Sequence, residues 1–138
     1  MPRYRLMEHT ADLGAWFYGR DPEAVFVNAG LALMTLMIER PPRRGEAVTA
    51  VALEASDPED LLVRWLNELL YLVQVKRRVA VSIRATGLTR TRFEADVETA
   101  GFDLARHGIR GEIKAATYHA LELRPWRGRW RARVVFDL

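Results

Sequence analysis

The fold is decided by residues 57–73, whose sequence is DPEDLLVRWLNELLYLV. Leucine, valine and tryptophan recur there every three or four residues, the spacing that places them on one face of an α-helix. Asp57 offers a side-chain cap, Pro58 stands where its missing N–H is harmless, and Glu59 suits the positive end of the helix dipole. We therefore expect a helix that begins at this cap and buries a broad apolar face. The residues expected on its opposite face are Arg64, Glu68 and Tyr71.

A second helix is predicted earlier in the chain by the same kind of start. Asp21-Pro22-Glu23 repeats the cap, the proline and the first-turn acid. Phe26 and Leu33 belong to an apolar series that continues at helical spacing through Met37. We expect Arg40-Pro41-Pro42 to end this helix, because proline excludes the helical conformation from the residue before it.

The remaining apolar residues alternate with polar ones, which is typical of half-buried strands. The sequence predicts an α+β domain over residues 1–138, with two long helices packed against mainly antiparallel sheets of about seven to eight strands. Arg127-Gly128 is expected to form a hairpin turn before the last strand. The expected strands cover residues 3–9, 15–19, 47–55, 79–84, 92–98, 113–124 and 130–137, and the longer loops cover 40–46 and 103–112.

Composition excludes several classes of protein. The 138 residues include no cysteine, which removes disulfide frameworks, cysteine metal sites and thiol nucleophiles. Residues 24–38 form the longest uncharged run, too short to span a bilayer, and the first residues lack a signal-peptide pattern, so we expect a cytoplasmic protein without a membrane partner. The net charge of +3 divides into −5 over residues 21–75 and +8 over the rest. We therefore expect two differently charged surfaces.

Catalytic motifs are missing from the sequence. Ser56 and Ser82 are the only serines, and neither lies in a Gly-x-Ser-x-Gly elbow. The chain also has no phosphate-binding glycine loop, no dinucleotide fingerprint and no His-Glu-x-x-His zinc helix. A metal-dependent hydrolase is the least favoured function, since neither a nucleophile nor a clustered acid and base is evident.

The densest polar cluster runs from Glu8 to Gly14, between two expected strands. Two interpretations of it stay open. In a turn, Asp12 would accept hydrogen bonds from nearby backbone N–H groups, and Gly14 would adopt a positive φ. In a cation site, Asp12 would supply a carboxylate oxygen, which Ca²⁺ and Mg²⁺ prefer, although one carboxylate would not suffice.

A second carboxylate occurs near the other end of the sequence. In the last expected strand, Asp137 points to the same side as Arg129, Arg131 and Arg133, because side chains alternate between the faces of a strand. Spacing alone does not show that Asp137 meets Asp12, since 125 positions separate them. An ordinary solvated strand end is the alternative for Asp137.

Arginine and tryptophan interleave in residues 124–133. Such a stretch could bind RNA, with guanidinium groups on phosphates and indole rings stacked on bases. Strand periodicity favours another interpretation, in which Trp130 faces the core and the arginine row protects a sheet edge. His107 and His119 have no other ligand-type residue at metal-ligand spacing, so we expect structural or surface roles for both.

Four motifs, found in order along nearly the whole chain, resemble those of the archease family. They are Glu8–Gly14 (EHTADLG), the helix 60–71, Arg106-His107 together with 114–121 (KAATYHAL), and the ending 134–138 (VVFDL). Ala116 stands where the family commonly has valine, and Ala120 where it commonly has glycine. These departures concern packing near Tyr118 and leave the acidic residues unchanged.

The resemblance implies a non-catalytic accessory protein of RNA processing. Archeases assist RtcB-type RNA ligases, which join RNA ends in tRNA splicing through a GTP-dependent, metal-requiring mechanism with a guanylylated histidine. The accessory protein promotes guanylylation and repeated turnover, and it would meet tRNA indirectly through the ligase. A tRNA-binding or chaperone-like role beside a tRNA-modifying enzyme is the alternative function.

The resemblance also implies site residues. The family's metal site maps onto Asp12, Asp137 and Leu138, the last through a backbone or terminal oxygen. The expected ion is Ca²⁺, with Mg²⁺ and Mn²⁺ as alternatives, and three protein ligands would leave positions open for water or a partner's oxygen atoms. The residues expected to contact a partner or RNA are His9, Arg64, Glu68, His107, His119, Arg129, Arg131 and Arg133. The sequence does not predict the oligomeric state.

Overall fold

A computed structural model of the chain describes residues 3–7 and 12–138. This part of the chain forms eight strands and three helices. In order they are β1 (Tyr4–Met7), β2 (Asp12–Gly19), α1 (Pro22–Met37), β3 (Ala47–Glu54), α2 (Pro58–Gln74), β4 (Arg78–Leu88), β5 (Arg92–Gly101), α3 (Leu104–His107), β6 (Ala115–Ala116), β7 (Glu122–Trp126) and β8 (Arg129–Asp137). None of the helices in these ranges is long and apolar enough to cross a lipid bilayer.

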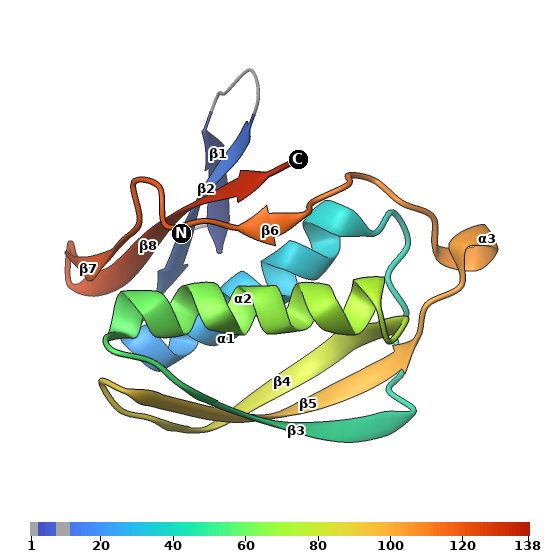
Figure 1. The fold of residues 1–138 in the computed structure, drawn as a ribbon, viewed down its shortest axis with the longest axis horizontal. Helices are drawn as coiled ribbons and strands as arrows, with labels where there is room; N and C mark the ends of the chain where they lie inside the picture. Colours follow the sequence, from blue (N-terminus) through green and yellow to red (C-terminus); the bar gives the residue numbers. More distant parts are fainter. Residues whose placement is uncertain (1–2, 8–11) are drawn as a thin grey trace.

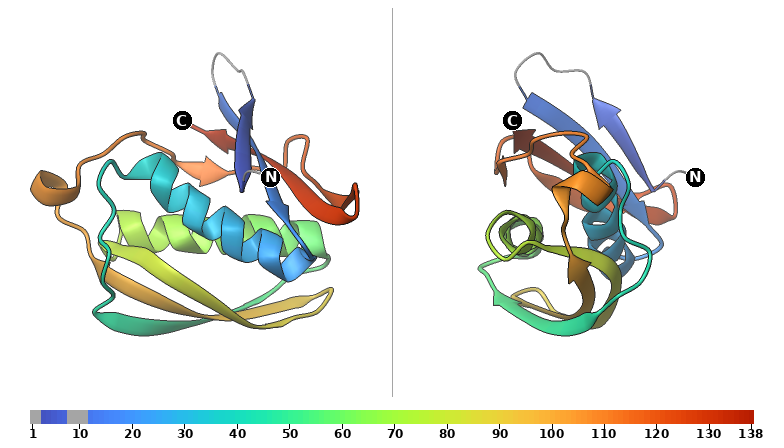
Figure 2. Two further views of the ribbon diagram at one scale, coloured as in Figure 1. Left: turned by 180° about the vertical axis from the view of Figure 1, so that it is seen from behind. Right: turned by 90° about the vertical axis from the view of Figure 1, so that its right-hand side faces the viewer.

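The strands form two sheets, and the two long helices lie between them (Figure 1). The five-stranded sheet has the order β1-β2-β8-β6, with β7 also paired to β8, and the three-stranded sheet has the order β3-β5-β4. Every strand pair is antiparallel. The views in Figure 2 show α1 and α2 between the sheets from two further sides. The predicted α+β class is therefore confirmed.

Both long helices begin at the predicted caps. Asp21 Oδ1 accepts a hydrogen bond from the Ala24 N–H at 2.8 Å, and Asp57 Oδ1 accepts one from the Asp60 N–H at 2.8 Å. These side chains satisfy backbone donors that have no partner within the helix. The end of α1 was predicted too late, because Ile38 already adopts an extended conformation and forms a β-bridge with Ile109.

The core gathers between the layers around Trp65 of α2. Its indole is fully buried, packs against the Phe93 ring at 4.9 Å, and donates from Nε1 to the Phe26 carbonyl at 2.8 Å. Fully burying one large apolar side chain contributes about 1.5–3 kcal/mol. The apolar face predicted for residues 57–73 therefore joins the two helices to the three-stranded sheet.

Two sequence predictions about the second half of the chain are wrong. The expected strand over residues 113–124 is interrupted between β6 and β7, where Ala120 adopts a φ of 51° and Thr117 Oγ1 accepts the His119 N–H at 3.3 Å. The expected loop 103–112 contains the short helix α3, which Asp103 caps by accepting the Ala105 N–H at 3.0 Å. Both features are too short to leave a clear period in the sequence.

The predicted hairpin turn joins β7 to β8. Arg127 and Gly128 have φ values of 49° and 76°, the pair of positive values that a type I′ turn requires. This turn matches the twist of the paired strands and fixes their register, with Trp126 opposite Arg129. Alternation along β8 then places Arg129, Arg131 and Arg133 on the same face as Asp137.

Candidate functional site

Asp12 and Asp137 stand opposite each other at the edge where β2 pairs with β8. Directly opposed residues of an antiparallel pair point to the same face, and their β-carbons lie about 4.5–5.5 Å apart. The sheet therefore brings together two carboxylates that are 125 positions apart in the sequence. Figure 1 shows the end of β8 beside the start of β2.

The backbone at Asp137 is held from both sides. β2 pairs with it on one side, and on the other side Ala115 of β6 is its register partner. The Lys114 N–H also donates to the Asp137 carbonyl at 2.9 Å. Asp12 is half-buried, whereas Asp137 and Leu138 are exposed. The carboxylate of Asp137 thus projects from a fixed strand toward solvent.

Two polar side chains of α2 hold the segment that carries β6. Asn67 accepts the Ala116 N–H at Oδ1 (2.8 Å) and donates from Nδ2 to the Ala116 carbonyl (3.2 Å). Gln74 donates from Nε2 to the Ile113 carbonyl at 2.7 Å. The sequence analysis missed both residues, although a lone asparagine in the apolar residues 57–73 was the available signal.

The donor set fits a hard cation. Carboxylate oxygens are the ligands that Ca²⁺ and Mg²⁺ prefer, and like charges directly opposite each other destabilise a sheet unless they are neutralised. Within residues 3–7 and 12–138, no group of three or more His, Asp or Glu residues could hold a metal. Two carboxylates would therefore leave several coordination positions open. His9 lies outside the described residues.

The outer face of the five-stranded sheet carries arginine and tryptophan beside this acid pair. Trp16 stands opposite Arg133 in the β2–β8 register, and Tyr18 opposite Arg131. The Arg131 guanidinium lies 4.2 Å from the centre of the Trp16 ring and 4.8 Å from that of Trp126. These side chains are on the same face as Asp12 and Asp137, because all of them occupy alternate positions of paired strands.

A second polar cluster lies near the start of α2. Tyr118 Oη donates to Asp60 Oδ1 at 2.6 Å, and Arg64 Nε approaches the same oxygen at 3.2 Å. The hydrogen bond from Tyr118 lowers the pKa of the Asp60 carboxyl, with a further contribution from Arg64, and it raises the pKa of Tyr118. The expected partner contact Arg64 is thus half of an ion pair whose acid is largely covered.

Two other expected contacts lie on α2 and in the turn after β6. Glu68 is half-buried on α2, and His119 is exposed in the turn after β6. Both stay predictions as partner contacts.

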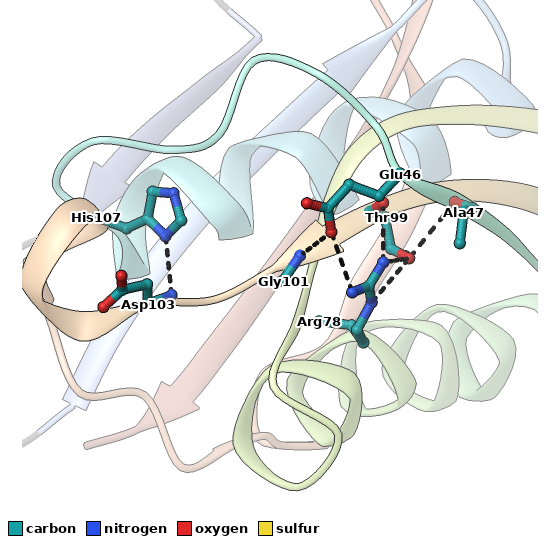
Figure 3. A network of polar contacts seen from close by, with 7 residues as sticks. All are labelled: Glu46, Ala47, Arg78, Thr99, Gly101, Asp103 and His107. Atoms are coloured by element: carbon teal, nitrogen blue, oxygen red, sulfur yellow. Dashed lines mark hydrogen bonds and ion pairs between the residues drawn. The ribbon is translucent and has the colours of Figure 1, made fainter.

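His107 has a local structural environment. The residue is 8% exposed, and its Nδ1 accepts the Asp103 N–H at 2.9 Å (Figure 3). Its ring also stacks on Phe102 with 5.9 Å between the ring centres. Figure 3 also shows Glu46, which accepts the Gly101 N–H at 2.8 Å and pairs with Arg78 at 3.2 Å. The bond from Gly101 lowers the pKa of Glu46, and Arg78 adds to this effect. These contacts join β4, β5 and the segment before β3.

Comparison with protein-family models finds a match over nearly the whole chain. The model of the family described as "Archease protein family (MTH1598/TM1083)" matches residues 4–138. The chain belongs to the archease family. The resemblance inferred from the four motifs is thereby confirmed, over nearly the whole length of the chain.

Curated archeases match the chain end to end. Protein archease of Methanosarcina mazei is 36% identical over 140 residues, covering 99% of this chain and 96% of the relative. Protein archease of Methanothermobacter thermautotrophicus is 32% identical over 146 residues and covers both chains completely. The archease fold of this chain is therefore supported by relatives of the same length.

Solved archease structures have the same fold. The solution structure of Methanobacterium thermoautotrophicum protein 1598 superposes with a TM-score of 0.75 at 29% identity and covers 100% of both chains. The crystal structure of a Thermotoga maritima protein described as "an archease, possible chaperone" gives a TM-score of 0.67 at 21% identity, covering 97% of this chain and 96% of that one. At that identity the second comparison supports the fold alone.

Proposed function

We propose that this archease is a non-catalytic activator of an RtcB-type RNA ligase in tRNA splicing or RNA repair. In this proposal it promotes guanylylation of the ligase by GTP and multiple turnover, and it uses a divalent cation at the Asp12–Asp137 edge. Family membership supports the accessory role. The observation that carries the cation site is the register that places Asp12 opposite Asp137.

The chain's own residues would prepare this edge for a partner. Asp12 and Asp137 would supply the carboxylate oxygens, and Leu138 a neighbouring main-chain oxygen. A bound Ca²⁺, Mg²⁺ or Mn²⁺ would neutralise the two acids and offer open positions to a partner's oxygen atoms. β6 and Asn67 keep the strand end in place, so the partner would meet a fixed pair of acids.

The environments of the two serines support a non-enzymatic role. Ser82 Oγ donates to Glu98 Oε1 at 2.9 Å on the three-stranded sheet, and Ser56 Oγ lies 3.5 Å from Asp60 Oδ2. Neither serine has a histidine base among its hydrogen-bond partners in the described part of the chain. In the proposal, covalent chemistry on RNA therefore belongs to the partner ligase.

Reconstituted ligation tests the proposal. The cognate ligase would be assayed under multiple-turnover conditions with a split tRNA, GTP and divalent metal, with and without this protein. Asp12→Asn and Asp137→Asn should each abolish turnover beyond the first cycle and slow ligase guanylylation, without changing the protein's circular dichroism. Asp96→Asn is the matched control, since this acid pairs with Arg84 on the other sheet. Full stimulation by both edge variants would disprove the metal-centred function.

A chaperone-like function beside a tRNA-modifying enzyme is the alternative that the family resemblance leaves open. It would appear as suppression of thermal aggregation of a tRNA-modifying enzyme. This suppression should be independent of divalent metal and unchanged in Asp12→Asn. Aggregation suppression without any effect on ligation would favour this alternative over ligase activation.

A further inference from the structure

We propose that the outer face of the five-stranded sheet binds the phosphate groups of single-stranded RNA directly, with Arg131 at its centre. We call this surface the arginine face and define it by Arg3, Arg5, Arg129, Arg131 and Arg133. The proposal adds a direct RNA contact to the proposed function. It rests on residues other than the acid pair, so the two can fail separately.

The strand register arranges these arginines in rows. Arg5, Trp16 and Arg133 are neighbours across β1, β2 and β8. In the next row, Tyr18 stands opposite Arg131, and its N–H donates to the Arg3 carbonyl at 2.9 Å. Rows on one face of a sheet are about 7 Å apart, because alternate residues share a face. The face thus presents a regular array of cations interleaved with aromatic rings.

Arg131 is held by aromatic rings. Its guanidinium lies 4.2 Å from the Trp16 ring centre and 4.8 Å from the Trp126 ring centre. Its Nε is buried and has no hydrogen-bond partner in the described ranges. Cation–π contacts orient the guanidinium plane without neutralising its charge. The two rings therefore fix the orientation of Arg131, and because its Nε is enclosed, a phosphate would have to meet its terminal nitrogens.

Most arginines of the arginine face have no ion-pair partner in the described part of the chain, in contrast to those of the other sheet, although Glu122 lies on this face opposite Arg133. Across residues 3–7 and 12–138, no carboxylate lies within ion-pair distance of Arg3, Arg5, Arg129 or Arg131. Arg133 lies 3.9 Å from Glu122, which also pairs with Arg124, and its Nε donates to the Ala120 carbonyl at 2.7 Å. The arginines of the three-stranded sheet have acidic partners: they are Arg78, Arg84 and Arg92. The high arginine content of the whole chain does not account for this difference between the sheets.

One end of the arginine face is hollowed. Arg3, Arg20 and Arg129 line a cavity of about 210 Å³ together with Tyr18 and Asn28. The Asn28 side chain donates to the Tyr18 carbonyl at 2.8 Å, which fixes the wall formed by α1 and β2. Arg20 lies 3.7 Å from Asp21, so Arg3 and Arg129 are the two cations at this hollow that would suit an oxyanion such as a phosphate group.

The aromatic rings favour RNA over an acidic protein surface. Single-stranded RNA combines phosphates with exposed bases, and proteins bind it with basic grooves in which aromatic side chains stack on the bases. Trp16 and Trp126 are both partly exposed within the cationic rows. Asp137 lies four residues along β8 from Arg133 and on the same face, so a bound strand would lead toward the acid pair.

Fluorescence anisotropy with labelled 12-nucleotide oligo(U) and oligo(A), without ligase, tests the proposal. Each phosphate contact on a single strand contributes about 0.7 to the slope of log affinity against log salt. Four phosphate contacts predict a slope of log affinity against log salt of about −2.8. The RNA affinity should therefore fall about 50-fold between 50 and 200 mM KCl. Arg131→Gln should reduce the slope by about 0.7 and weaken binding about eightfold at 50 mM, equally for both sequences.

Matched variants decide between the outcomes. Arg92→Gln makes the same charge change on the other sheet, where this residue pairs with Glu54 and Glu94, and should leave RNA binding unchanged. Arg5→Gln alters an exposed side chain and should weaken binding even if Arg131→Gln impairs folding. Asp12→Asn should retain RNA affinity whether or not it stimulates the ligase.

Three results would overturn the proposal. The first is wild-type RNA affinity in folded Arg131→Gln and Arg5→Gln. The second is an equal loss of affinity in Arg92→Gln, which would indicate an effect of net charge alone. The third is displacement of RNA by polyglutamate of the same charge at equal concentration, which would identify the arginine face as a docking surface for an acidic protein.

Discussion

Replacing Asn67 with alanine tests how α2 holds the strand beside Asp137. Asn67 bonds both the N–H and the carbonyl of Ala116, at 2.8 and 3.2 Å, and Ala116 is 5% exposed. A buried backbone group left without a partner costs about 1–3 kcal/mol. With two such groups released, Asn67→Ala should lower the free energy of unfolding by about 2–6 kcal/mol.

Urea denaturation followed by tryptophan fluorescence measures this change, and amide hydrogen exchange reports on Ala116 directly. The m-value should stay constant while the urea midpoint falls, because losing this contact lowers the free energy of unfolding but hardly changes the surface area that unfolding exposes. Gln74→Ala is the control, since it frees only the Ile113 carbonyl and should cost about half as much. A stability change below about 0.5 kcal/mol in Asn67→Ala, with the Ala116 amide still protected, would refute the reasoning.

Three further predictions concern the core, the α2 cluster and one tight turn. Trp65→Phe should lower unfolding stability by about 2–4 kcal/mol in a thermal melt, because it shrinks a buried side chain and frees the Phe26 carbonyl; a melt within a degree or so of wild type would contradict this. The lowered pKa of Asp60 adds stability above its unfolded pKa near 3.8, and this stability is lost as the pH falls through the lower folded value. Tyr118→Phe should raise the pKa of Asp60 and so reduce the loss of unfolding free energy on acidification, measured by urea titrations at several pH values. An unchanged dependence of the unfolding free energy on pH would show that Tyr118 has no such effect. Gly19→Ala should destabilise by about 1–3 kcal/mol, because a β-carbon there would lie 2.5 Å from a backbone nitrogen at the start of α1, and equal stability in urea would show that the turn can adjust.

Local patterns predicted the helices and the last hairpin well. Asp21 and Asp57 act as caps, and the apolar face of residues 57–73 is buried, since caps and helical periodicity depend only on near neighbours. Arg127-Gly128 forms its turn for the same reason. The family resemblance was equally available, because its motifs are short stretches in a fixed order.

The predictions failed where short elements depend on distant partners. β6 has two residues and exists through its pairing with β8 and the bonds from Asn67, so no alternation marks its end. The early end of α1 likewise depends on Ile109, which lies 71 positions beyond Ile38. Tertiary partners outweigh local propensity at such places.

The sequence by itself determined which chemical groups the protein has: two helix starts, a carboxylate near each end, no thiol and an arginine-rich strand. Only the tertiary structure decided that Asp12 faces Asp137, because cross-strand register is set by every pair along β2 and β8 and not by spacing in the chain. It also decided which arginines are neutralised. Those of the three-stranded sheet meet carboxylates across strands, whereas Arg131 packs on two indole rings and has no carboxylate within ion-pair distance in the described part of the chain.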